Sequence, residues 1–285
     1  VSAADQAALP ATQDLAQKPL NRQGIKAVDL FVMAGQSNMQ GWQGNAQDYP
    51  ADPQNADRAI RFYWVTPGHS SSDGRWTTLR AQGGRFPKGH FGPEVEFARK
   101  LKAQGFNPAI FKYSLGSTGL ARDWRAPGGG GLYDRMVKEL REAIALLEKE
   151  GQPVKVRAFV WIQGESDAET DALAAGYFDR LKRLIGDLRH KVVKDEGLPV
   201  LLGLDEQHPW VQARPGVIEA QKRFVREDVA SVFVSMSGLA KADASHLTPS
   251  GLEAHGRRLF DAVVQLRAAV DTRARNPVVA PAAGR

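Results

Sequence analysis

The chain has 285 residues, no cysteine, 42% hydrophobic and 25% charged residues, and a formal net charge of +6. This composition is typical of a globular protein with a sizeable core, and the lack of cysteine excludes disulfides and thiolate chemistry. The basic residues are scattered without interleaved aromatic residues, and no apolar run approaches the roughly 18 residues of a membrane span. Neither a nucleic acid nor a membrane is therefore an expected partner.

Apolar, β-branched segments alternate with amphipathic helical patterns along the chain. Strands that alternate with helices of this length predict βαβ units, and therefore an α/β fold whose parallel sheet has helices on both faces. The expected strands are 29–34, 59–65, 108–114, 154–162, 199–204 and 231–235, and the expected helices are 93–104, 133–150, 171–194, 216–227 and 249–270.

One domain is expected, because the interior contains neither a linker nor an internal repeat. We place it at 27–270, between an N-terminal arm at 1–26 and a flexible tail at 271–285. Residues 2–18 resemble a mature N-terminus after removal of a signal, so the expected location is secreted or periplasmic. The Gly/Ser-rich stretch 66–92 is expected to form a functional rim or a mobile loop.

A run of apolar residues at 31–34 leads directly into Gly35-Gln36-Ser37-Asn38, with no polar turn between them. An apolar run bounded by glycine is typical of a buried strand of a parallel sheet, and open α/β folds build their sites at the carboxyl ends of such strands. A helix that begins after Ser37 leaves backbone N–H groups beside its hydroxyl, which suits a nucleophile and an oxyanion. The alternative is that Ser37 only caps that helix.

A serine nucleophile needs a base, and the base needs an orienting carboxylate. Among the six histidines His246 stands out, because Asp243 precedes it by three residues and both side chains can face one side. Thr248-Pro249 then provides an N-cap and a first-turn proline for the last helix. Asp205 and His208 have the same spacing after another strand, so spacing alone does not separate the two pairs. His208 is accordingly a candidate substrate contact.

Two further strand ends carry groups able to hold an oxyanion. Gln163 follows the strand at 154–162 and can direct its amide N–H at the carbonyl that Ser37 attacks. Gly116 can let its backbone N–H approach a ligand closely. A capped helix start at 166–167 and a plain turn are the alternative interpretations.

Three other side chains near these loops are candidates for contacting a ligand. Trp42 and Trp124 can stack on the flat face of a ligand such as a sugar, and Arg122 can contact an acidic one. Core packing of the tryptophans and a surface arginine without a ligand are the alternatives. No histidine or carboxylate cluster has convincing metal spacing, and no phosphate-binding motif is present. The sequence therefore predicts neither a metal nor another cofactor.

Four ordered segments give the chain a specific resemblance. They resemble the blocks of the SGNH hydrolase superfamily and, more narrowly, of its sialate O-acetylesterase and acetylxylan-esterase branch, carbohydrate esterase family 6. The segments are Gly35-Gln36-Ser37-Asn38-Met39, Gly116, Gln163-Gly164-Glu165-Ser166-Asp167 and Asp243-x-x-His246. Phe91-Gly92-Pro93-Glu94 and Trp124 also match that branch, and the resemblance spans about 28–266.

The resemblance implies a three-layer αβα sandwich with a mainly parallel five-stranded sheet and no metal. It also implies a catalytic triad of Ser37, His246 and Asp243. The implied oxyanion hole consists of the backbone N–H groups of Ser37 and Gly116 together with the amide of Gln163. Gln163 departs from the superfamily's usual asparagine, as it does in the carbohydrate-esterase branch.

Glu165 and Asn38 are expected to support the site. The glutamate of the third block has been considered a triad member in some relatives, so Glu165 is a rival to Asp243 for orienting the base. We favour Asp243, because its three-residue spacing to His246 needs no help from the fold. Glu165 is then expected to support the Ser37 turn through backbone N–H groups.

The expected activity is that of a serine esterase that removes O-acetyl groups from acetylated oligo- or polysaccharides, such as acetylxylan, through an acyl-enzyme. The alternatives are a sialate O-acetylesterase, a short-chain acyl transferase or thioesterase of the same superfamily, and a glycan-binding module without turnover. The complete Ser/His/Asp set disfavours the binding module. The protein is expected to act as a monomer.

Overall fold

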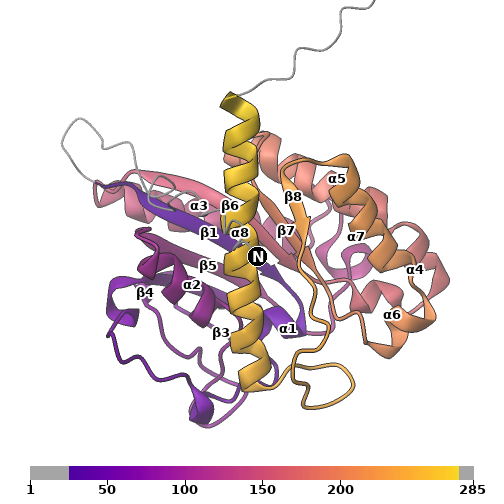
Figure 1. The fold of residues 1–285 in the computed structure, drawn as a ribbon, viewed down its shortest axis with the longest axis horizontal. Coiled ribbons are helices and arrows are strands. Elements are labelled where there is room, and N and C mark those ends of the chain that lie inside the picture. The colour runs from indigo at the N-terminus through magenta and orange to yellow at the C-terminus, as the bar shows by residue number, and fades with distance from the viewer. Residues whose placement is uncertain (1–25, 276–285) are drawn as a thin grey trace, which may run out of the picture.

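A mainly parallel sheet forms the centre of the protein. The computed structural model describes residues 26–275. Its strands are β1 (Val28–Gly35), β2 (Arg61–Thr66), β3 (Ser70–Ser71), β4 (Thr77–Thr78), β5 (Pro108–Ser114), β6 (Val154–Ile162), β7 (Val200–Gly203) and β8 (Ser231–Phe233). They lie in the order β3-β2-β5-β1-β6-β7-β8, with β4 also paired to β2 (Figure 1). The strands from β2 to β8 in this order pair in parallel, whereas β3 and β4 are antiparallel to β2.

Helices cover both faces of the sheet. They are α1 (Ser37–Gln40), α2 (Glu94–Ala103), α3 (Leu132–Lys149), α4 (Asp171–Ala175), α5 (Tyr177–Asp187), α6 (Pro209–Ala213), α7 (Gly216–Glu227) and α8 (Pro249–Arg275). The apolar side chains of α2 and α8 share one core with the sheet, and those of α3, α5 and α7 share the other. Figure 1 shows α8, in yellow, crossing the near face of the sheet. The result is a three-layer αβα sandwich.

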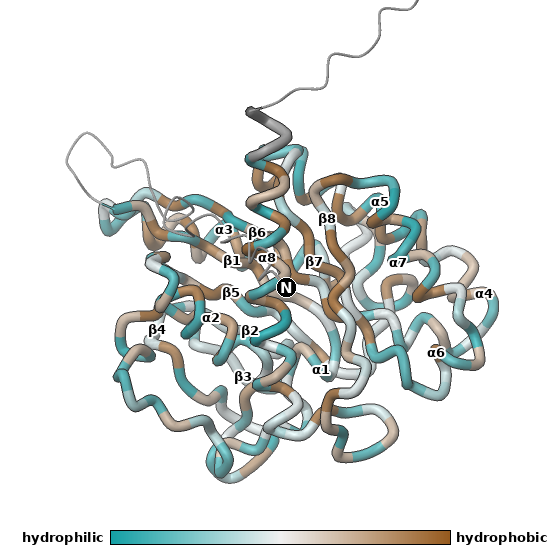
Figure 2. The backbone as a smooth tube through the Cα atoms, in the orientation of Figure 1, coloured by the Kyte–Doolittle hydropathy of each residue, from teal (hydrophilic) through white to brown (hydrophobic). Residues whose placement is uncertain are grey.

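The centre of strand β1, residues 30–34, is apolar because both of its faces are covered. Leu30 and Val32 pack into the core beneath α3, α5 and α7, whereas Phe31 and Met33 pack into the core beneath α2 and α8. Successive side chains of a strand point to opposite faces, so a strand covered on both sides is apolar at successive positions. The one charged residue of β1, Asp29, is buried in an ion pair with Arg157 at 2.7 Å. The hydropathy colouring of the backbone shows the same apolar centre (Figure 2).

The predicted α/β class is confirmed, with corrections of detail. All six predicted strands are present, so the parallel part of the sheet has six strands rather than the five implied by the resemblance, and β3 and β4 extend its edge from the 66–92 stretch. The helix predicted at 171–194 is divided at Gly176 into α4 and α5, because glycine is a poor helix former. Its last part, Leu188–Val193, forms a π turn. The short helix α6 was not predicted, and α8 continues to Arg275 instead of ending at 270.

The carboxyl ends of four parallel strands meet at one edge of the sheet. Gly35 at the end of β1 is paired in register with Ser114 of β5 and with Ile162 of β6, and Ile162 is paired with Gly203 of β7. The loops that leave these strands are therefore neighbours, as the position of sites in open α/β sheets requires.

Most of the predicted N-terminal arm, 1–26, and the last part of the predicted tail, 276–285, lie outside the described residues. Within 26–275, no helix combines the length and the apolar character that crossing a membrane requires.

Candidate active site

Ser37 stands at a sharp turn between β1 and α1. Gly35 has a φ of 151°, and a Cβ on it would lie 2.0 Å from the carbonyl oxygen of Ile162, so the turn requires glycine. Gln36 occupies the N-cap position and Ser37 is the first helical residue, with no side-chain cap bond. The capping alternative for Ser37 is therefore wrong. Among the described residues no acceptor binds the backbone N–H of Ser37, which leaves this group available beside the hydroxyl.

His246 is oriented by Asp243, as the spacing predicted. The Nδ1 atom of His246 lies 2.9 Å from Oδ2 and 3.0 Å from Oδ1 of Asp243, and the backbone N–H of His246 donates to Oδ1 at 2.9 Å. Burial raises the pKa of Asp243, but hydrogen bonds from the His246 ring and the Ser245 N–H outweigh this effect and lower it to about 2. With Nδ1 committed to a carboxylate, the Nε2 of a neutral ring is free to accept a proton.

Asn38 connects the nucleophile turn to the loop that carries His246. Its Nδ2 donates to the carbonyl oxygen of Ser245 at 3.0 Å, and its Oδ1 accepts from the N–H of Leu247 at 3.0 Å. Both contacts are with the immediate neighbours of His246. Asn38 therefore holds that ring next to the turn that presents Ser37, which gives the predicted supporting residue a definite position.

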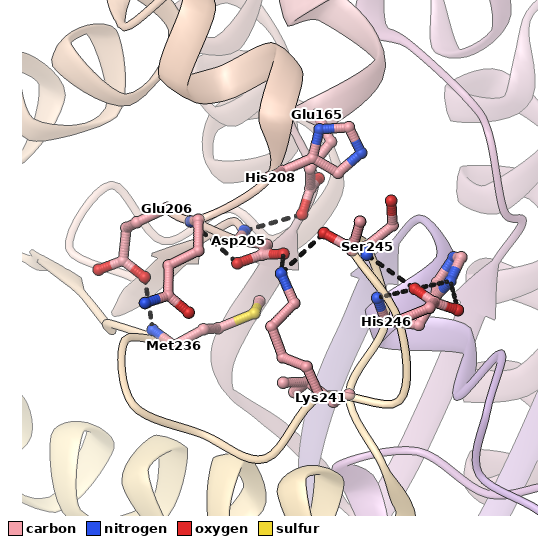
Figure 3. Close-up of polar contacts among 12 residues, drawn as sticks. Glu165, Asp205, Glu206, His208, Met236, Lys241, Ser245 and His246 are labelled. Carbon is pink, nitrogen blue, oxygen red and sulfur yellow. Dashed lines mark hydrogen bonds and ion pairs between the residues drawn. The ribbon is translucent and has the colours of Figure 1, made fainter.

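The same loop is held from its other side by the turn that follows β7 (Figure 3). Lys241 donates to the carbonyl oxygen of Ala244 at 2.8 Å and forms an ion pair with the buried carboxylate of Asp205. Glu206 accepts from the N–H of Met236 at 2.8 Å. Lys241 and Glu206 were missed in the sequence, because a single lysine or glutamate in a loop has no local pattern that reveals its partner.

Ser37 and His246 line one cavity of about 300 Å³, which we call the Ser37 cavity. Within the described part of the chain no hydrogen bond joins the Ser37 hydroxyl to the ring of His246. Such catalytic bonds are often long without substrate and tighten on binding. Other residues that line the Ser37 cavity are Gln36, Ser117, Glu165, Ser166, His208 and Ser245.

His208 does not form a second histidine–aspartate pair. Its Nδ1 accepts from the backbone N–H of Trp210 at 3.1 Å, while Asp205 pairs with Lys241. Burial lowers the pKa of His208, although the nearby Asp205 opposes this effect. A neutral ring whose Nδ1 is an acceptor carries its hydrogen on Nε2. The Ser37 cavity is thus lined by one histidine suited to accept a proton, His246, and by one suited to donate a hydrogen bond, His208.

Glu165 lies in the wall of the Ser37 cavity, but it does not contact His246. Its Oε1 accepts from the N–H of Asp205 at 2.8 Å, and its buried Oε2 has no partner in the described structure. Burial raises the pKa of Glu165 to about 7, although the Asp205 N–H and Lys241 act in the opposite direction. Glu165 therefore supports the end of β7 rather than the Ser37 turn, which corrects the predicted contact.

The two other predicted oxyanion donors already have partners. The N–H of Gly116 donates to Oε1 of Gln40 at 2.8 Å. Gln163 is fully buried, and its amide donates to the carbonyl oxygen of Thr118 at 3.0 Å and to Oδ2 of Asp167 at 2.7 Å. An amide has only two hydrogens, so in this arrangement Gln163 has none to offer an oxyanion. The geometry does not support its predicted role.

Two of the predicted sugar contacts lie away from the Ser37 cavity. Trp124 is fully buried, packs edge-on against Trp161 with ring centroids 4.7 Å apart, and donates to Thr118 at 3.0 Å. The prediction for Trp124 is therefore wrong, since core packing hides the ring from any ligand. Arg122 pairs with Glu169 at 2.8 Å and lines a separate cavity of about 320 Å³.

Trp42 lies beside the base. Its ring centroid is 6.1 Å from that of His246, with an angle of 36° between the rings. The guanidinium of Arg85, from the 66–92 stretch, covers the Trp42 ring at 3.8 Å and donates to the Trp42 carbonyl oxygen at 2.8 Å. Trp42 thus packs between a cation and the base, and a sugar contact for it stays a prediction.

The segment Phe91-Gly92-Pro93-Glu94 proves to support the nucleophile helix. Glu94 pairs with Lys112 at 2.7 Å, and both side chains are completely buried. Lys112 also donates to the carbonyl oxygen of Gln40, the last residue of α1, at 3.1 Å. Burial lowers the pKa of Lys112, although Glu94 opposes this effect. A lysine within the apolar strand β5 was the signal in the sequence that a buried partner exists.

The αβα fold, the serine at the end of β1 and the histidine–aspartate pair beside it define an esterase of the SGNH type. The model of the family described as carbohydrate esterase, sialic acid-specific acetylesterase, matches residues 27–265. The chain belongs to this family, and it is a carboxylic ester hydrolase that deacetylates carbohydrates.

Individual relatives agree with this assignment. The chain is 31% identical over 203 residues to a probable carbohydrate esterase of Arabidopsis thaliana, covering 65% of this chain and 70% of the relative. A solved Arabidopsis thaliana structure has a TM-score of 0.65 at 26% identity, covering 83% of this chain and 98% of its own. NanS shares the fold with a TM-score of 0.60 at 18% identity, covering 85% of this chain and 98% of its own. A carbohydrate acetylesterase from Xanthomonas citri shares it with a TM-score of 0.57 at 21% identity, covering 84% of this chain and 56% of its own.

Proposed function

We propose that the protein removes O-acetyl groups from an acetylated glycan with Ser37 as nucleophile, His246 as base and Asp243 as the residue that orients it. The observation that carries this proposal is the shared cavity: Ser37 and His246 line it together, and Asn38 binds the chain on both sides of His246. Because the Asp243 carboxylate accepts from Nδ1 of His246, Nε2 is left to take the proton of the Ser37 hydroxyl.

The reaction proceeds in two steps. His246 takes the proton of the Ser37 hydroxyl as its oxygen bonds to the acetyl carbon, and the N–H of Ser37 donates to the oxyanion that forms. The bond to the sugar oxygen then breaks, and that oxygen takes the proton from His246. Water attacks the acetyl-serine in the second step with His246 again as base, which releases acetate and restores Ser37.

The walls of the cavity favour a short acyl group on a polar alcohol. The cavity is about 300 Å³, and the serines 117 and 166 and His208 line it beside Ser37. A lipase or a long-chain thioesterase needs an apolar channel for its acyl chain, because burying apolar surface supplies its binding energy. Hydroxyl and imidazole groups instead suit the hydroxyls of a sugar. The family's description favours sialic acid as that sugar, and acetylated xylan is the alternative.

Acetate release tests the proposal. Acetylated sialic acid, acetylated xylan and acetylated pectin are each incubated with the wild-type protein and with Ser37→Ala. At least one substrate should release acetate, and Ser37→Ala should lose about 10³-fold or more of that rate while its melting transition is retained. Ser117→Ala, which changes another serine of the same cavity, is the matched control and should stay active. Equal rates for Ser37→Ala and the wild type would end the proposal, and an acetyl ester formed with an added alcohol would favour the transferase.

A further inference from the structure

The side chain of Gln36 has a fixed direction. Its Oε1 accepts from the backbone N–H of Gly164 at 3.4 Å and from that of Ser166 at 3.3 Å. Because a backbone N–H only donates, the carbonyl oxygen of the amide must be the atom that faces these two groups. The NH₂ group of Gln36 consequently points the other way.

This NH₂ group has no partner among the residues that the structure describes. Its nitrogen is also not one of the buried side-chain atoms left without a partner, so it reaches open space. Gln36 is only 5% exposed, and the cavity that it lines is the Ser37 cavity. A nearly buried amide with two free donors is therefore turned toward the place where substrate binds. Because these donors are held in place and the described protein offers them no acceptor, they are available to an acceptor on the ligand.

The hydrolysis of an ester needs more than one donor for the oxyanion, and the turn around Ser37 leaves few candidates. Within residues 26–275 the N–H of Ser37 has no acceptor, whereas the N–H of Gly116 and the amide of Gln163 are bound within the protein. Gln36 directly precedes the nucleophile in the chain, so its amide is positioned by the same turn. Two backbone N–H groups hold it in place before substrate arrives, as preorganised transition-state stabilisation requires.

We propose that the side-chain amide of Gln36 is the second donor of the oxyanion hole, acting with the backbone N–H of Ser37. The inference rests on the proposed function, since it needs an oxyanion to form on the acetyl group that Ser37 attacks. In this proposal Gln36 contributes one N–H···O⁻ hydrogen bond, which strengthens as the carbonyl oxygen of the acetyl group gains charge. No bond in Gln36 is made or broken.

The test uses two substitutions that differ in what they preserve. Gln36→Glu keeps an oxygen for the N–H groups of Gly164 and Ser166 but replaces the NH₂ group with a second oxygen. A pH of about 8.5 lies well above the ordinary pKa of a glutamate, and a carboxylate at this place repels the oxyanion. Gln36→Met has a similar shape and neither donor nor charge. Turnover of an aryl acetate gives kcat and KM, and thermal melting reports the fold.

Loss of one hole donor typically lowers kcat by about 10²–10³-fold. We expect a loss of this size for Gln36→Glu, with KM nearly unchanged and a cooperative melting transition retained, and a similar loss for Gln36→Met. A structural role through Oε1 alone would spare Gln36→Glu and affect only Gln36→Met, which would overturn the inference. A raised KM at unchanged kcat would also overturn it, because it would indicate a ground-state contact.

Ser37→Ala separates the two proposals. If Ser37→Ala is inactive while both Gln36 variants turn over like the wild type, the role of Gln36 is wrong and the serine mechanism remains. If Ser37→Ala keeps wild-type turnover, the serine mechanism fails, and the inference about Gln36 fails with it.

Discussion

Asn38 binds the backbone on both sides of His246: Nδ2 donates to the Ser245 carbonyl at 3.0 Å, and Oδ1 accepts from the Leu247 N–H at 3.0 Å. The residue next to the nucleophile thereby determines where the base lies, although more than two hundred residues separate them in the sequence. The two loops are thus joined by specific hydrogen bonds of one side chain and not only by their general proximity.

Replacing Asn38 with leucine should impair turnover more than folding. Two hydrogen bonds are lost, each worth about 0.5–1.5 kcal/mol, so the free energy of unfolding should fall by roughly 1–3 kcal/mol. The His246 loop is then free to shift, and kcat for an aryl acetate should fall by about tenfold or more, since small displacements of a catalytic group are costly. Asn107→Leu is the matched control, because Asn107 bonds Ala27 and Arg61 at the opposite edge of the sheet. It should lose stability without losing kcat; equal kcat losses in both variants would contradict the account.

Asp243→Asn should leave the fold intact and lower kcat by about 10²–10⁴-fold, because an amide can hold the ring in the wrong tautomer. The same residue affects acid stability. Its pKa is lowered in the folded protein from 3.8 to about 2, so its stabilising effect is present above about pH 4 and is lost as the pH falls toward 2. Between these pH values the free energy of unfolding should depend less on pH in Asp243→Asn than in the wild type. An identical dependence in both would show that the carboxylate is not stabilised by His246.

Glu165 should make the protein less stable as the pH rises. Burial raises its pKa from 4.5 to about 7, so the carboxyl stays protonated in the folded state while it ionises in the unfolded chain. The stabilising effect is complete below about pH 4.5 and is lost as the pH rises through 7, with a total of the order of 3 kcal/mol. The free energy of unfolding, measured by chemical denaturation across this pH range, should change less with pH in Glu165→Gln than in the wild type. Glu148→Gln, which changes an exposed glutamate, should follow the wild type. A Glu165→Gln profile as steep as that of the wild type would refute this assignment.

The buried pair of Lys112 and Glu94 should be important for stability. Lys112→Met leaves the buried Glu94 carboxylate without its cation and with only the Gly92 N–H as a partner, which typically costs about 3–5 kcal/mol. The double variant Lys112→Met/Glu94→Leu removes both charges and should recover part of that loss. Lys138→Met breaks the exposed pair with Glu142, and it should cost well under 1 kcal/mol. Equal costs for Lys112→Met and Lys138→Met in urea unfolding would contradict the role of the buried pair.

The fold was largely predictable because its signals are local. Each strand covered on both faces reads as an apolar run, and the helix patterns at 216–227 and 249–270 place their ends within a few residues of α7 and α8. The break at Gly176 and the short helix α6 escaped prediction, because single glycines and single turns have weak signals.

The site was predictable where its contacts are short in sequence. The pairing of His246 with Asp243 lies within one turn of chain, so spacing alone indicated it. The direction of a side chain at the end of a strand depends instead on distant partners. Gln163 turns toward Thr118 and Asp167, and Trp124 packs into the core, which no local pattern reveals. The contacts of Asn38 with Ser245 and Leu247 span 207 and 209 positions of the chain, and they were out of reach for the same reason.

The most direct test of the mechanism is to detect the acetyl group on the nucleophile. Wild-type protein is mixed with an acetylated glycan that it turns over, quenched rapidly in acid, and digested for mass spectrometry. The account predicts an acetyl group on the peptide that contains Ser37, on that residue alone, and its disappearance once the substrate is consumed. Acetate release at the full rate from Ser37→Ala, or steady turnover with the acetyl group found on a different residue, would contradict it.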